Sequence, residues 1–199
     1  MAITAEQVKQ LRDKTGAGMM ECKAALTEAN GNEEEAITLL RKRGLAQAAK
    51  RAGRATAQGT IGTYIHLGGR IGVMVEVNCE SDFVARTDDF NSLVKEVAMH
   101  IAAGDPKWVR REDVPAEAIE KEKGIYRAQM EGQNKPANVI DKIIEGKLGS
   151  FYSQFVLLDQ PSIRDGNVTI AQVVAAASAK TGENIQISRF TRYRVGEEV

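Results

Sequence analysis

The sequence predicts an α+β protein in which a small helical module precedes a core domain with a small antiparallel sheet packed by helices. Two observations support this. Apolar residues recur at helical spacing through residues 1–44, whereas after residue 58 they alternate on both sides of a Gly-Gly pair before helical spacing returns. We therefore expect a helical module over 1–44, a basic linker helix over 45–58 and an α+β core over 59–199.

Three short helices are predicted in the N-terminal module. Thr4, with Gln7 three residues later, forms a capping-box pattern, and the helix that it starts ends before Gly16. Residue types that begin or end helices bound the other two, which are expected from Met19 to Ala29 and from Asn32 to Gly44.

The stretch from Leu45 to Ala57 is rich in alanine and basic residues and has almost no apolar face, which predicts a connecting helix. No acidic residue occurs between Glu35 and Glu76. The basic stretch from Arg41 to Arg54 is usually a solvated helix face, and the alternative is contact with an acidic partner or RNA. Aromatic residues that would stack on bases are missing from it, which disfavours RNA.

The core begins with a predicted hairpin, in which apolar residues between Ile61 and Leu67 and between Ile71 and Val77 lie on either side of Gly68-Gly69. Helical spacing follows from Phe90 to Ile101 and ends at Gly104. The remaining predicted elements are two charged helices that could form a hairpin (116–131 and 136–148), a candidate strand (155–158), an alanine-rich helix (170–180) and a final strand (185–195).

Composition argues against several classes of function. The 27 basic and 27 acidic residues cancel, so nothing global indicates nucleic-acid or membrane binding. No apolar run approaches the roughly 18 residues of a bilayer span, and no signal-peptide pattern opens the chain. The two cysteines provide neither a disulfide framework nor zinc-site spacing. We expect a folded protein of the reducing cytosol.

No residue pattern typical of an enzyme or a cofactor site is present. Gly16-Ala17-Gly18 begins like a phosphate loop, but no strand precedes it and Glu21 stands where a third glycine would be. His66 and His100 have no cysteine or carboxylate at ligand spacing. We therefore expect no catalytic residue, no metal and no cofactor.

Two apolar features have competing interpretations. Phe83, within the segment from Asn78 to Arg86, is either a core side chain or an exposed wedge beside the charge of Asp82. Met19-Met20 is either core or an adaptable contact surface.

Two longer motifs resemble signatures of the elongation factor Ts family. The first combines Leu11-Arg12 with residues 15–23, and the second is residues 75–85, where Ser81 replaces the family's usual threonine. Residues 98–102, 146–148 and 181–185 extend the similarity over nearly the whole chain, whose length resembles the family's short form.

This resemblance implies a translation factor that is not an enzyme and that binds elongation factor Tu to promote release of GDP for GTP. It implies a ubiquitin-associated-like N-terminal module whose contacts with the partner are Arg12, Met19 and Met20. It further implies that Ser81, Asp82, Phe83 and Val84 displace the partner's Mg²⁺, with Asp82 and Phe83 pushing between its helices, and that His66 touches the same partner domain.

Short members of the family tend to act as pairs, which implies a possible homodimer formed by the core domain. Thr191 stands where a short-form relative carries a cysteine, so an intersubunit disulfide there is impossible. Three alternatives remain: an adaptor that binds ubiquitin-like or other folded domains, an RNA-binding factor, and an enzyme, which direct GTP or GDP binding by this chain would reveal.

Overall fold

The computed structural model describes residues 3–130 and 136–197. The chain divides into two compact units, each made of three segments. The first unit contains Met1–Ile61, Glu76–Val94 and Gln172–Ile187, and the second contains Gly62–Val75, Lys95–Ala171 and Ser188–Val199. Helices and a sheet are both present, which confirms the predicted α+β class.

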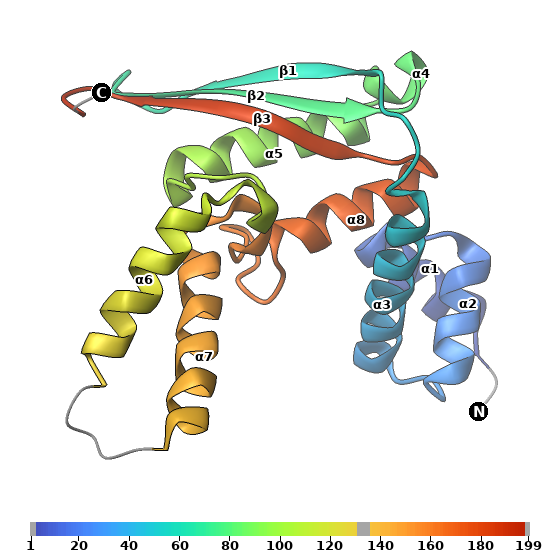
Figure 1. Ribbon diagram of the computed structural model, residues 1–199. Helices are drawn as coiled ribbons and strands as arrows, with labels where there is room; N and C mark the ends of the chain where they lie inside the picture. Colours follow the sequence, from blue (N-terminus) through green and yellow to red (C-terminus); the bar gives the residue numbers. More distant parts are fainter. Residues whose placement is uncertain (1–2, 131–135, 198–199) are drawn as a thin grey trace. The chain divides into compact units, whose positions relative to one another are not determined.

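The first unit opens with the three expected helices, α1 (Ala5–Thr15), α2 (Met19–Glu28) and α3 (Glu33–Arg51) (Figure 1). The capping box of Thr4 and Gln7 is present at α1. Asn32 caps α3 by accepting hydrogen bonds from two backbone N–H groups of its first turn. These helices enclose a common apolar core, whose buried members are Val8, Leu11, Cys22, Ala25, Leu26, Ala29 and Ala36.

The expected end of the third helix at Gly44 is wrong. Helix α3 continues through Gly44 to Arg51, and residues 52–57 are not helical before strand β1 begins. A glycine inside a helix costs only about 1 kcal/mol relative to alanine, and the residues that follow are good helix formers. Residues 45–51 of the predicted linker helix therefore form the end of α3. The division into 1–44, 45–58 and 59–199 stays a prediction.

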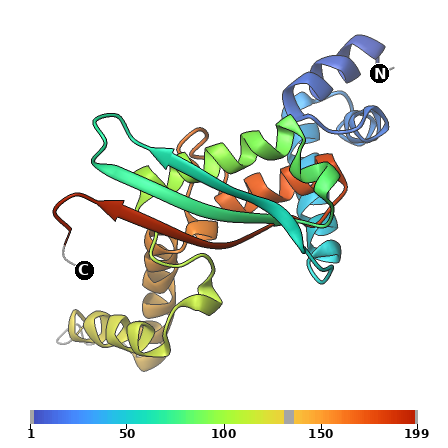
Figure 2. The ribbon, with the colours of Figure 1, turned by 90° about the horizontal axis from the view of Figure 1, so that it is seen from above.

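Three strands form one antiparallel sheet in the order β1 (Gln58–Ile65), β2 (Ile71–Cys79) and β3 (Gln186–Arg194), as expected, and each strand runs through both units (Figure 2). The turn between β1 and β2 uses Gly68 and Gly69, both at positive φ, which glycine adopts without steric cost. Burial alternates along β2: Val73, Val75, Val77 and Cys79 are buried.

Five further α-helices complete the described fold: α4 (Asp82–Ala85), α5 (Asp88–Gly104), α6 (Ala116–Ala128), α7 (Ala137–Phe155) and α8 (Ile170–Thr181). Helix α5 runs along one face of the sheet, and α6 packs against α7 as the expected helical hairpin (Figure 1). Two 3₁₀ turns, Arg111–Asp113 and Leu157–Asp159, lie in the second unit. Within residues 3–130 and 136–197, no helix combines the length and apolar character that crossing a bilayer requires.

The strand expected at 155–158 is wrong. Helix α7 extends to Phe155, and Leu157 opens a 3₁₀ turn. Val156 makes only an isolated bridge to Trp108. A short apolar run cannot be assigned by periodicity alone, and here burial explains it, because Val156 and Leu157 are completely buried.

Candidate functional site

The segment Ser81 to Val84 forms a short projecting turn directly after β2. Ser81 is the N-cap of α4, and its Oγ accepts a hydrogen bond from the Val84 backbone N–H at 3.3 Å. Asp82, in the first turn, accepts a hydrogen bond from Arg86 at 2.8 Å, and both side chains of this pair are substantially exposed. The hydroxyl thus fixes the start of a helix that is only four residues long.

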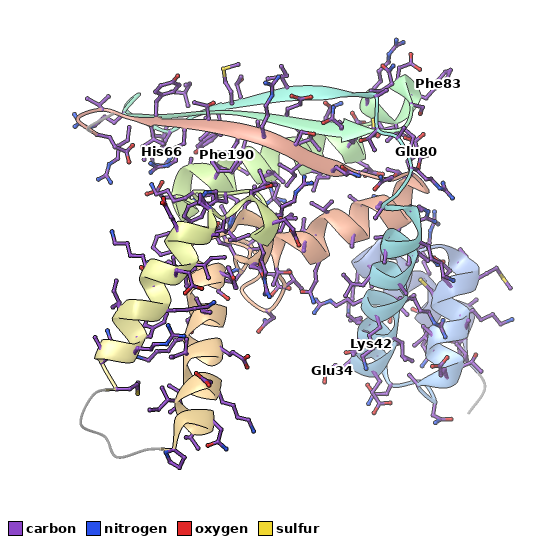
Figure 3. All side chains as sticks on the ribbon, viewed as in Figure 1. Glu34, Lys42, His66, Glu80, Phe83 and Phe190 are labelled. Carbon is purple, nitrogen blue, oxygen red and sulfur yellow. The ribbon has the colours of Figure 1, made fainter. Side chains whose placement is uncertain are left out.

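Phe83 is exposed, which excludes its interpretation as a core side chain. Its relative exposure is 79%, and Figure 3 shows it projecting from α4. Aromatic side chains supply much of the binding energy where two proteins meet, provided that the partner buries them. The structure therefore places an aromatic side chain and the Asp82 carboxylate at neighbouring positions on one exposed turn.

A carboxylate from the loop after α8 holds the base of this turn. Oε2 of Glu183 accepts hydrogen bonds from the backbone N–H groups of Glu80 and Ser81, both at 3.0 Å. Its Oε1 accepts a third from the Ser81 hydroxyl at 2.5 Å. Burial, reinforced by the negative charge of Glu183, raises the pKa of the neighbouring Cys79 thiol, which donates to the Ser81 carbonyl oxygen at 3.1 Å. The thiol is therefore kept in its protonated form.

The same loop also contacts the segment that follows α3. Asn184 is buried, and its backbone N–H donates to Glu80 Oε1 at 2.6 Å. Its side-chain amide donates to the carbonyl oxygen of Arg54 at 2.9 Å. The Arg54 guanidinium in turn lies 3.4 Å from Glu80. The segment that follows α3 and the turn that carries Phe83 are thus anchored to one loop.

The predicted docking residues of the helical module lie on its surface. Arg12 on α1 is exposed, and Met19 and Met20, at the start of α2, are 46% and 75% exposed. Gly16 ends α1 at a φ of 69°, a left-handed conformation that glycine adopts easily. The turn that follows leads into α2, where the methionines face solvent while Cys22 is buried. Flexible methionine side chains on a surface suit contact with a partner.

The two histidines have different environments in the second unit. His66 is exposed at the end of the hairpin, where its Nδ1 lies 3.1 Å from the Tyr64 hydroxyl. His100 is buried, and its Nε2 lies 2.8 Å from Gln160 Oε1. Burial lowers the pKa of His100. No group of three His, Cys, Asp or Glu side chains in the described part of the chain could hold a metal ion.

The predicted site residues fall into two sets. Arg12, Met19, Met20 and the turn from Ser81 to Val84 belong to the first unit, and His66 belongs to the second. Sequence reasoning did not single out Glu183, because it is 102 residues from Ser81 and no local pattern links them. The pair of Asp82 and Arg86 could have been found from its i,i+4 spacing.

Comparison with known proteins gives consistent matches over nearly the whole chain. A family model described as Elongation factor TS matches residues 2–197. The chain is 60% identical over 197 residues to elongation factor Ts of Fervidobacterium nodosum, covering 99% of this chain and 100% of that protein. It is 58% identical to the protein of the same name from Solibacter usitatus, covering 98% and 92%, and 57% identical to that of Koribacter versatilis, covering 99% and 90%.

Proposed function

The chain belongs to the elongation factor Ts family of translation elongation factors, and on this basis we propose that it is a guanine nucleotide exchange factor. It binds elongation factor Tu carrying GDP and promotes release of GDP so that GTP can replace it. The single observation that supports this most strongly is the exposed Phe83 beside Asp82 on a turn whose base is hydrogen-bonded.

The proposed action is mechanical and electrostatic. Phe83 enters between helices of the partner near its Mg²⁺ site, and Asp82 brings a negative charge there. A magnesium ion bound to phosphates neutralises their clustered charge, so its displacement removes much of what retains GDP. The effect is reciprocal: if the factor weakens GDP binding by some ratio, GDP weakens binding of the factor by the same ratio. No covalent step is needed, and the chain itself acts without a cofactor or a catalytic residue.

Docking is assigned to the helical module. Arg12, Met19 and Met20 contact the nucleotide-binding domain of the partner, and His66 touches the same domain. Their exposure in the free protein supports this assignment, because a contact residue must be accessible before the partner arrives. A factor with this role acts in the cytoplasm, where translation takes place.

We further propose that two copies of the chain pair through the outer face of the sheet. Within the second unit, Ile65, Met74 and Tyr193 are 67%, 52% and 70% exposed, although they belong to strands. Exposed apolar side chains gathered on one sheet face are typical of an interaction surface. With Thr191 in β3, such a pair contains no disulfide at that position.

Release of labelled GDP tests the function. Purified elongation factor Tu loaded with labelled GDP is mixed with excess unlabelled nucleotide and increasing amounts of the chain. We expect a release rate that rises with concentration and then saturates. No acceleration at any concentration would contradict the proposal, and binding of a ubiquitin-like domain with no effect on GDP release would favour the adaptor instead.

A further inference from the structure

We propose that Glu183 is a positioning residue for the exchange turn, which we define as Ser81 to Val84. Its carboxylate holds this turn in the orientation that presents Phe83 to the partner. The expected effect on GDP release rests on the proposed exchange function. The hydrogen bonds from which the inference is argued are present in the free chain and do not depend on that function.

Three donors from the base of the turn converge on this one carboxylate. The backbone N–H groups of Glu80 and Ser81 and the Ser81 hydroxyl all donate to Glu183, at 3.0, 3.0 and 2.5 Å. Hydrogen bonds to an ionised acceptor are about twice as strong as those between neutral groups. The direction in which the chain leaves β2 is therefore fixed by Glu183.

That direction determines where Phe83 points. Helix α4 has four residues, and so short a helix is not stable on its own. Its first turn depends on the cap, in which Ser81 Oγ accepts from the Val84 N–H while its proton is donated to Glu183. The serine hydroxyl thus links the carboxylate to the helix that carries Phe83.

The backbone of Glu183 is held in place by the end of α8. Gly182 has a φ of 77° and its N–H donates to the carbonyl oxygen of Ser178 at 3.0 Å, which closes the helix. The Ser178 hydroxyl then donates to the Glu183 carbonyl oxygen at 2.5 Å. Next in the chain, Asn184 is anchored to the backbone after α3. Glu183 is therefore a fixed point against which the turn is oriented.

The test separates positioning from docking. GDP release from elongation factor Tu is measured against concentration for wild type, Glu183→Ala and Glu183→Gln. For Glu183→Ala we expect the saturating rate to fall about tenfold, while the concentration for half-saturation changes less than about threefold because the module's docking residues are untouched. Glu183→Gln keeps one carbonyl acceptor and should lose less.

A stability control accompanies these variants. Ile101→Val, completely buried in the second unit, should lower thermal stability without changing the saturating rate. The two variants are compared under conditions in which Ile101→Val and Glu183→Ala have lost the same thermal stability. If Ile101→Val then lowers the saturating rate as much as Glu183→Ala does, the positioning role is refuted.

Amide hydrogen exchange in the free protein gives an independent readout. In Glu183→Ala, the amides of Glu80 and Ser81 should exchange about tenfold faster while those in the middle of β2 keep their protection. Should Glu183→Ala not fold, Glu183→Gln takes its place in both assays. Unchanged protection of the two amides, or an unchanged saturating rate, would overturn the inference. If the wild type itself fails to accelerate GDP release, the proposed function fails, and the amide exchange still decides whether Glu183 holds the turn.

Discussion

Replacing Phe83 with alanine should separate the stability of the protein from its activity. Because Phe83 is 79% exposed, its truncation should change the free energy of unfolding by less than about 0.5 kcal/mol. Full burial of a phenylalanine side chain by a partner is worth about 1.5–3 kcal/mol. If that free energy drives GDP release, the saturating release rate should fall between about tenfold and about a hundredfold.

The assay compares Phe83→Ala with Ile163→Ala, which truncates another exposed apolar side chain, 50% exposed, in a loop of the second unit. Denaturant unfolding and GDP release are measured for both variants. Ile163→Ala should match the wild type in both. Equal exchange rates for Phe83→Ala and the wild type would refute the wedge, and so would a loss of several kcal/mol of stability, since Phe83 would then be a packing residue.

Three further predictions concern the fold and its assembly. Gly59 has a φ of 147°, and an added Cβ would lie 2.2 Å from the Val77 carbonyl oxygen. Gly59→Ala should therefore lower the free energy of unfolding by about 2–3 kcal/mol or more. The control is Gly53→Ala, which should not destabilise the protein because an added Cβ there would meet open space. A wild-type-like denaturation midpoint for Gly59→Ala would contradict the strand pairing. Burial lowers the pKa of His100, so the folded state favours the neutral ring. Below the ordinary pKa of 6.5 the unfolded state binds a proton more readily than the folded state. The free energy of unfolding should therefore be constant with respect to this group above pH 6.5 and fall by up to about 1.4 kcal/mol per pH unit below it. Urea unfolding at pH 7.5 and 5.5 checks this, and His100→Gln should abolish that part of the pH dependence. Met74→Lys should shift the dimer toward monomer in sedimentation experiments without unfolding the chain. If the wild type sediments as a dimer and Met74→Lys sediments in the same way, the outer face of the sheet is excluded as the dimer interface.

Much of the secondary structure could be predicted because its signals are local. The capping box of Thr4 and Gln7 and the alternation of Val73, Val75 and Val77 depend only on nearby residues. The predicted helix end at Gly44 was wrong because a helix tolerates one glycine when good helix formers follow it. The strand predicted at residues 155–158 was wrong because a buried apolar run occurs both in strands and at the ends of helices, so the run alone does not tell them apart.

The candidate site was only partly predictable. The motif around Asp82 and Phe83 was visible, but whether Phe83 is buried depends on what packs around it in three dimensions. The contacts of Glu183 and Asn184 with Glu80 join residues more than a hundred positions apart, and such pairs leave no local pattern. The sequence could therefore indicate which turn to propose as the site, and the structure adds the hydrogen bonds that hold this turn.

The most direct test of the exchange mechanism is GDP release from elongation factor Tu with and without Mg²⁺. Chelation of Mg²⁺ removes the ion that the factor is proposed to displace, so release from the partner alone should become faster. The further acceleration by the wild-type chain at saturation should then be smaller, as a ratio, than in the presence of Mg²⁺. An equal ratio under both conditions would contradict displacement of Mg²⁺ as a step in the exchange.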